Sequence, residues 1–168
     1  MRAATTEDGP GRVRPSTPAR LTALRLLAQR RLTEAQLWNR LGRKGYEDVE
    51  IHEAVERCKR DGFVDDRLFA RLFLEGKRKA LGDARLVGEL VRKGVDRDVA
   101  SSQVAQWESD ERSRCRDAFS GIAAKSTVVA YSSAARMLER RGFPASTIYA
   151  VLREHASAFG PLANLAND

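Results

Sequence analysis

The spacing of hydrophobic residues predicts helices along almost the whole chain. From residue 19 onward, apolar residues recur at intervals of three and four, which is the spacing of one face of an α-helix. No proline occurs between residues 19 and 143, and no strand-like alternation persists for more than a few residues. We therefore expect an all-α protein. The leucines that mark its inward helix faces are Leu21, Leu24, Leu27, Leu68 and Leu72.

A short motif, two basic residues followed by glycine and an apolar residue, occurs three times. Its glycines are Gly45, Gly94 and Gly142, which lie 49 and 48 residues apart. A leucine stands four residues before each glycine, and an apolar residue stands ten residues after it. Three occurrences with the same offsets predict an internal repeat. The leucines are Leu41, Leu90 and Leu138, and the later apolar residues are Val55, Val104 and Leu152.

Each motif is typical of a helix end. Glycine after a helix adopts the left-handed conformation, and the next residue folds back onto the last turn. The start of a helix is also recognisable at Thr33, where Gln36 completes a capping-box pattern, and at Asp65-Asp66 and Gly82-Asp83. Each repeat is thus predicted to hold three short helices.

These signals divide the chain into five segments. We expect a flexible tail over residues 1–18, three-helix repeats over 19–64, 65–110 and 111–158, and a second tail over 159–168. A single three-helix unit has too small a hydrophobic core to be stable alone, so we expect such units to stack on their neighbours. The predicted architecture is an elongated array of three tandem three-helix repeats.

The charge balance indicates an anionic partner. Lys and Arg number 30 against 23 Asp and Glu, which gives a net charge of +7. No apolar run approaches the ~18 residues that cross a bilayer, and the N-terminus lacks the apolar stretch of a secretory signal. We expect a cytoplasmic, monomeric protein that does not meet a membrane and keeps its two cysteines as free thiols.

Groups for catalysis are scarce. His52 and His155 have no partner at metal-ligand spacing, and Cys58 and Cys115 form no CxxC pair. Neither a P-loop nor a GxGxxG motif occurs, so we expect no nucleotide and no other cofactor. We interpret the chain as a non-enzymatic protein without a metal.

Asp65 and Asp66 are the most conspicuous carboxylate pair. Adjacent residues at a helix start do not face one another, and a helix-capping role accounts for one of them. A structural role is therefore favoured over catalysis or metal binding.

Basic residues point to a binding face. Residues 71–93 contain seven cations against three carboxylates, more than helix ends require. The predicted face consists of Arg71, Lys77, Arg78, Lys79, Arg85, Arg92 and Lys93, with Arg43, Lys44, Arg140 and Arg141 at the equivalent helix ends of the other repeats.

Several separated segments resemble the RecX family of bacterial regulatory proteins. The densest match is GFVDDRLFA at residues 62–70. Further matches follow in the family's order over residues 27–37, 81–86, 90–95 and 138–143, so that the resemblance covers roughly residues 19–155. The chain departs from the family pattern over residues 125–133, which are less basic than the pattern leads us to expect.

The resemblance implies a fold and a function. RecX proteins are tandem three-helix repeats that bind the RecA recombinase and its filament on single-stranded DNA. They suppress its ATPase, strand exchange and co-protease activity, and so limit recombination and the SOS response. The resemblance also implies that Asp65 and Asp66 fix the angle between the first two repeats.

Two other classes of function stay open at this point. One is an autonomous helical nucleic-acid-binding module of helix-turn-helix type, and the other is a structural adaptor without nucleic acid. Aromatic residues for base stacking are absent from the basic stretches, and the basic residues spread over all three repeats. Both observations favour filament docking, with weak direct DNA binding left open.

The repeat architecture predicts the shape of the molecule in solution. We expect small-angle X-ray scattering to report an elongated monomer, because each repeat contacts only its neighbours in such an array. A radius of gyration near ~15 Å, the value for a compact domain of this length, would contradict the array.

Overall fold

The computed structural model describes residues 15–76, 80–124 and 130–159, with side chains up to residue 156 in the last range. In these ranges every regular element is an α-helix, so the predicted all-α class is confirmed. The helices are α1 (Ala19–Gln29), α2 (Glu34–Arg43), α3 (Asp48–Arg60), α4 (Asp66–Glu75), α5 (Asp83–Arg92), α6 (Arg97–Ala105), α7 (Glu111–Ala123), α8 (Tyr131–Arg140) and α9 (Ala145–Phe159).

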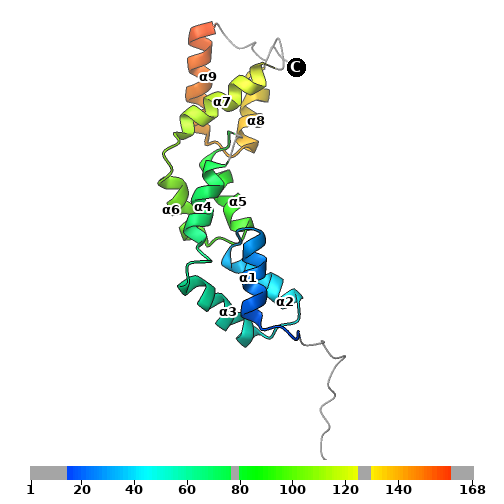
Figure 1. Ribbon diagram of the computed structural model, residues 1–168. Helices are drawn as coiled ribbons and strands as arrows, with labels where there is room; N and C mark the ends of the chain where they lie inside the picture. The colour runs from blue at the N-terminus through cyan, green and yellow to red at the C-terminus, as the bar shows by residue number, and fades with distance from the viewer. Residues whose placement is uncertain (1–14, 77–79, 125–129, 160–168) are drawn as a thin grey trace, which may run out of the picture. The chain divides into compact units, whose positions relative to one another are not determined.

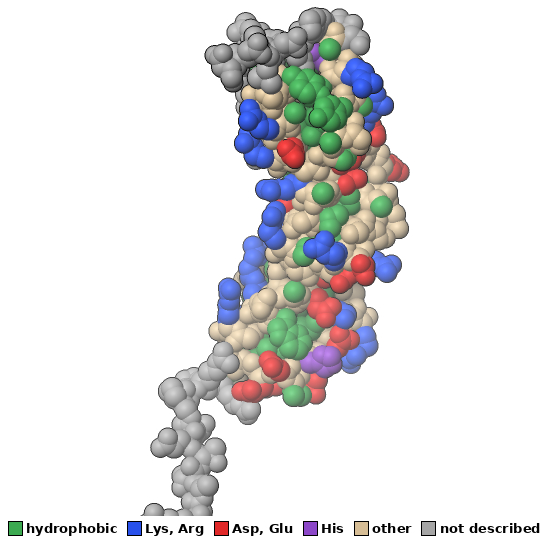
Figure 2. Space-filling view, turned by 180° about the vertical axis from the view of Figure 1, so that it is seen from behind, with side chains coloured by type: hydrophobic (Ala, Val, Ile, Leu, Met, Phe, Trp, Pro, Cys, Tyr) green, Lys and Arg blue, Asp and Glu red, His purple; other side chains and the backbone are tan. Residues whose placement is uncertain are grey.

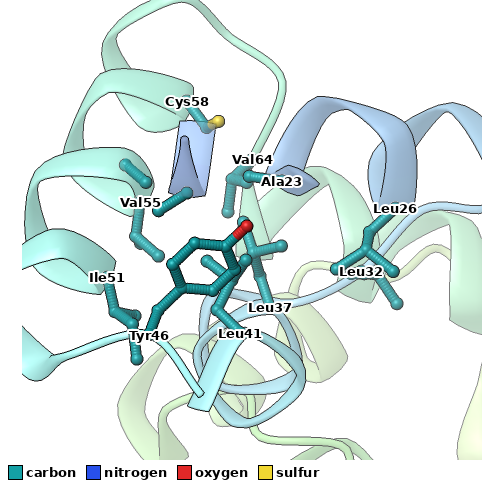
Figure 3. Packing of buried hydrophobic residues seen from close by; sticks show 12 residues of the cluster. Ala23, Leu26, Leu32, Leu37, Leu41, Tyr46, Ile51, Val55, Cys58 and Val64 are labelled. Atoms are coloured by element: carbon teal, nitrogen blue, oxygen red, sulfur yellow. The ribbon is translucent and has the colours of Figure 1, made fainter. Parts of the chain in front are cut away.

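The chain divides into two compact units, one ending at Asp65 and the other beginning at Asp66. The first unit contains the first group of helices, α1–α3, which all contact one another (Figure 1). Figure 3 shows the ring of Tyr46 among the apolar side chains of this core. Tyr46 follows the first repeat glycine, is 4% exposed, and its hydroxyl group donates to the carbonyl oxygen of Thr17. The residue after the glycine therefore joins the core, as the repeat pattern predicts.

The buried face of α1 differs from the predicted one at Leu21, whereas Leu24 and Leu27 are partly buried and pack against the core as predicted. Leu21 is 50% exposed, whereas Ala23 and Leu26 are buried. A small residue such as Ala23, which has no exposed surface, lets the backbone of α1 approach α3 closely, so the contact face is turned away from Leu21. Leu72 of α4 is exposed for the same reason, because Ala70 occupies the buried position.

The second unit contains two further groups of helices, each with its own core. In the middle group, α6 contacts both α4 and α5, and the core includes Leu74, Leu86 and Leu90. In the last group, α7, α8 and α9 all contact one another around Phe119 and Leu138. A leucine side chain buried this fully contributes about 2 kcal/mol to the free energy of folding.

The three repeat glycines have the left-handed conformation that the motif predicts. Gly45, Gly94 and Gly142 have φ angles of 92°, 90° and 86°. In each turn the residue after the glycine donates its amide to the carbonyl of the repeat leucine, as Val95 does to Leu90 at 3.1 Å. The glycine itself donates to the carbonyl three residues before it, as Gly94 does to Val91. This pair of bonds is the Schellman motif, which satisfies the last carbonyls of a helix.

A fourth left-handed glycine ends α3 and was not predicted. Gly62 has a φ angle of 77°, and Phe63 donates its amide to the carbonyl of Cys58 at 2.9 Å. The sequence signal was present, because Lys59 and Arg60 precede this glycine closely. Gly62 lies outside the 48-residue repeat, so the repeat pattern does not single it out.

Helix α2 begins as its capping residue predicts. The Thr33 side chain is fully buried and accepts a hydrogen bond from the amide of Gln36 at 3.2 Å. None of the helices in the described ranges is long and apolar enough to span a membrane. Of the predicted tails, residues 1–14 and 160–168 lie outside the described ranges.

Two glycines of the middle group provide a matched test of the turn. Gly94→Ala places a side chain at a left-handed position and is expected to lower the free energy of unfolding by about 1 kcal/mol. Gly88 lies inside α5, where a new Cβ would meet nothing within 4 Å. Gly88→Ala is therefore expected to raise the free energy of unfolding by up to about 1 kcal/mol. Urea denaturation followed by circular dichroism measures both values; equal effects of the two substitutions would contradict a special role for Gly94.

Candidate partner-binding surface

The predicted cationic residues occupy the same place in all three groups. Arg43, Arg92 and Arg140 are each the last residue of a helix, two residues before a left-handed glycine, and all three are exposed. Within the described ranges none of the three forms an ion pair with a carboxylate. Their charges lie at the negative end of the helix dipole, which is an electrostatically favourable position for a cation. The fold thus presents one exposed guanidinium at the same turn of every group.

The second basic residue of each motif differs between groups. Lys44 is exposed, the Nζ atom of Lys93 lies 5.3 Å from the centre of the Phe73 ring, and Arg141 donates through Nη1 to the carbonyl of Ala118 at 3.1 Å. The last two side chains are half-buried because they pack on neighbouring helices. Arg141 therefore has a structural role in addition to its charge.

The other predicted cations belong to the middle group. Arg71 on α4 is exposed, and so is Arg85 on α5, whose Nε lies 3.6 Å from a carboxylate oxygen of Glu89. Lys77, Arg78 and Lys79 lie outside the described residues. Arg43 and Lys44 belong to the first unit, whereas all the other described members of the predicted face belong to the second.

The structure brings Arg85 and Arg141 together through two glycines. The Gly82 amide, at the start of α5, donates to the carbonyl of Arg141 at 3.0 Å. A Cβ atom on Gly82 would lie 2.1 Å from the carbonyl oxygen of Gly142, and one on Gly142 would lie 2.5 Å from the Cβ of Arg85. Only glycine allows two backbones to approach this closely. The turn that ends α8 is therefore in direct contact with the start of α5.

A buried arginine, Arg114, stabilises the contact between the start of α5 and the end of α8. Arg114 of α7 is 7% exposed, and its Nε donates to the carbonyl of Leu81 at 3.0 Å. Its guanidinium also bonds the carbonyl of Ser109 and the carboxylate of Asp83, and lies 4.8 Å from the centre of the Trp107 ring. A buried guanidinium is stable only with such a complete set of partners.

A second carboxylate completes this region. Glu111 accepts the amide hydrogen of Asp83 at 2.8 Å, which satisfies a donor at the first turn of α5. We call the set Gly82, Asp83, Glu111, Arg114, Arg141 and Gly142 the joint, because it connects the middle group to the last group inside the second unit. The joint fixes where the exposed cations of these two groups stand relative to one another.

The sequence predicts only part of the joint. It predicts a helix end at Gly142 and a helix start at Gly82-Asp83, but it does not indicate that these two segments are in contact. Arg114 resembles any surface arginine in the sequence; the one available signal is its place beside Cys115, on a helix face that carries Ala118 and Ile122. The structural assignment of Asp65 and Asp66 stays a prediction, with Asp66 as the first residue of α4.

The two thiols are poor nucleophiles. Both cysteines are buried, and burial raises the pKa of Cys115 to about 11, with the nearby Glu111 carboxylate acting in the same direction. Burial also raises the pKa of Cys58. Among the described residues no group of three or more His, Cys, Asp and Glu side chains could hold a metal ion.

Comparisons with known proteins agree on one family. The family model described as "RecX, first three-helix domain" matches residues 19–58. The chain is 34% identical to the "Regulatory protein RecX" of Thermobifida fusca (strain YX), over 95% of this chain and 92% of that protein. It is 30% identical to the protein of the same name from Amycolatopsis mediterranei, over 85% and 86% of the two chains.

A solved structure has the same fold. The crystal structure of RecX from Lactobacillus salivarius superposes with a TM-score of 0.74, over 81% of this chain and 93% of that one. The two sequences are only 15% identical over this alignment, so the likeness concerns the fold.

The joint predicts that two neighbouring arginines differ in their effect on stability. Arg114→Ala removes a buried cation and leaves the carbonyls of Leu81 and Ser109 without their donor, so we expect a loss of about 2–3 kcal/mol in the free energy of unfolding. Arg112→Ala removes an exposed ion pair with Glu154 and should cost less than about 1 kcal/mol. Urea titration of both variants checks this difference, and a loss for Arg114→Ala no larger than that for Arg112→Ala would rule out the joint.

Proposed function

Because the chain belongs to the RecX family of regulatory proteins, we propose that it binds the RecA recombinase and the RecA filament on single-stranded DNA, and that it lowers the activity of that filament. The activities concerned are DNA-stimulated ATP hydrolysis, strand exchange and co-protease function, and their loss would limit recombination and the SOS response. The protein acts by binding and performs no chemistry of its own. Its place is the bacterial cytoplasm, where the filament forms, and it acts as a monomer.

One observation carries the proposal beyond family membership. An exposed guanidinium stands at the same helix end in all three groups, next to a glycine turn that cannot be replaced without strain. A filament assembled on DNA is a repeating partner that contains a polyanion, and each of these exposed cations is attracted to it. Attraction of this kind raises the rate of association and favours an anionic partner over a cationic one.

The second unit gives this surface a fixed geometry. The joint connects the middle and last groups, so Arg92 and Arg140 belong to one compact unit and need not be ordered separately when the partner binds. Pre-ordered contacts lose less conformational entropy on binding than mobile ones do. The proposed inhibition follows from occupancy, because a protein bound along a filament stands where the filament must move or exchange DNA.

The direct experiment measures ATP hydrolysis by RecA from the same organism, on single-stranded DNA, with increasing amounts of this protein. We expect the rate to fall at substoichiometric to stoichiometric ratios of this protein to RecA. An unchanged rate over that range would overturn the proposal. If excess DNA restores the rate fully, the protein acts by sequestering DNA, which is the alternative of an autonomous nucleic-acid-binding module.

Neutralising the repeated guanidinium should weaken inhibition. The variant Arg43→Gln/Arg92→Gln/Arg140→Gln keeps helix propensity nearly unchanged, and we expect at least a ~10-fold rise in the concentration that half-inhibits RecA, about 1.4 kcal/mol. The matched control is Arg60→Gln/Arg97→Gln/Arg136→Gln, which removes the same charge from three exposed positions, one in each group. Circular dichroism verifies folding of both variants. An equal loss of inhibition in both would indicate general charge attraction without a defined surface.

A further inference from the structure

The last group carries a pair of aromatic rings, of which one is exposed and the other is partly buried against the core. Tyr131, at the start of α8, and Tyr149, in the first half of α9, have ring centres 6.0 Å apart and planes that differ by 25°. Tyr149 is 54% exposed, although it lies beside a well-packed core. In Figure 2 a hydrophobic patch lies on this group at the top of the view, with Lys and Arg side chains on both sides of it and an acidic side chain at its lower edge. The exposed ring of Tyr149, stacked on the partly buried ring of Tyr131, offers an aromatic surface to solvent.

Among the described residues, several helix neighbours of the two rings have short side chains. On α9, the neighbours of Tyr149 one turn before it are Ala145 and Ser146, and on α8, Ala134 and Ala135 follow Tyr131 by one turn. These side chains are too short to cover a phenol ring. A ring whose face is left uncovered by its neighbours can accept a second planar group.

The charge next to the rings is positive. Arg153 follows Tyr149 by four residues on α9, and no carboxylate stands three or four residues from either tyrosine along its helix. The guanidinium is close enough to Tyr131 to act on the pKa of that phenol, which burial and Tyr149 raise and Arg153 lowers. An anionic group bound beside the rings would thus meet a cation.

The first unit contains a useful contrast. His52 occupies the same repeat position as Tyr149, seven residues after the repeat glycine, and its ring lies 6.3 Å from that of Trp38. These two rings meet edge to face at 66°, and carboxylates flank His52 at Asp48 and Glu56, one turn away on either side. That pair therefore lacks both the parallel rings and the positive surroundings of the tyrosine pair.

We propose that Tyr131 and Tyr149 form a stacking platform for a base of single-stranded DNA, with Arg153 beside it to bind the adjoining phosphate. Stacking on aromatic side chains is insensitive to sequence, since every base has a π-face, and it is regularly combined with cations that follow the backbone. The proposal rests on the proposed function, which supplies the single strand, and adds to it a direct contact with DNA. A hydrophobic segment of a protein partner fits the site less well, because short neighbours leave no walled pocket around the rings.

This platform could not be found by scanning the basic stretches for aromatic residues. Tyr131 and Tyr149 are separated by 17 residues in the sequence, and the packing of α8 on α9 brings them together. Aromatic residues are absent from the basic stretches of the sequence, but the tertiary structure brings these two rings together from two different helices.

The experiment compares two oligonucleotides in the absence of RecA. Fluorescence anisotropy at low ionic strength measures binding of the full chain to oligo(dT) of about 16 nucleotides and to an abasic strand of the same length, which has the phosphates but no bases. We expect Tyr149→Ala to weaken binding of oligo(dT) about 10-fold and to leave binding of the abasic strand unchanged. Tyr149→Phe keeps the ring and should bind as the unchanged protein does, and His52→Ala is the matched control in the first unit.

Salt dependence separates the roles of ring and cation. Arg153→Gln should reduce the slope of log affinity against log salt by about 0.7, the value for one phosphate of a single strand, whereas Tyr149→Ala should leave that slope unchanged.

Three results would overturn the proposal: no loss of oligo(dT) binding in Tyr149→Ala, an equal loss on the abasic strand, or an equal loss in His52→Ala. If Tyr149→Ala binds DNA normally but no longer inhibits RecA, the pair contacts protein instead. If oligo(dT) binding depends on Tyr149 while the protein leaves RecA unaffected, the platform stands and the proposed function fails.

Discussion

The left-handed glycine turn after each pair of basic residues is the constraint on which the structure depends. It ends the second helix of every group, directs the next apolar residue back onto the core, and satisfies the carbonyls that the helix would otherwise expose. Tyr46, Val95 and Phe143 are buried for this reason. The same turn leaves the guanidinium of the preceding arginine at the surface. The glycine turn therefore both buries the apolar residue that follows it and exposes the charge that precedes it.

In the second unit the turn has an additional use. Gly142 ends α8 and also lies against Gly82, so that two backbones meet where no side chain fits. Arg114, Asp83 and Glu111 then satisfy the polar groups that this contact takes out of water. A three-helix group has a small core, and the joint lets two such groups share their stability. The resulting unit holds Arg92 and Arg140 in a fixed relation, which is what a repeated binding surface requires.

Local features of the fold could be predicted from the sequence, and long-range ones could not. Helix ends at Gly45, Gly94 and Gly142 follow from short-range chemistry, because the left-handed conformation and the returning apolar residue are encoded within ten residues. The prediction that Leu21 lies on the buried face of α1 was wrong. Leucine is more hydrophobic than alanine and is therefore the residue that the sequence pattern favours, but Ala23 is small enough to allow the closer helix contact. Gly82 and Gly142 lie 60 residues apart, and neither local sequence indicates that the two glycines are in contact. The same limit applies to Arg114 and to the Tyr131–Tyr149 pair.

Amide hydrogen exchange at Gly82 shows whether the joint holds the middle and last groups together. Gly82 precedes the first residue of α5, where an amide has no partner within its own helix, and here it donates to the carbonyl of Arg141 across the joint. If the joint holds the middle and last groups together, this amide exchanges as slowly as those in the core of α5, because it opens only when the two groups separate. Exchange at the rate of an unstructured peptide would show that the two groups are not joined.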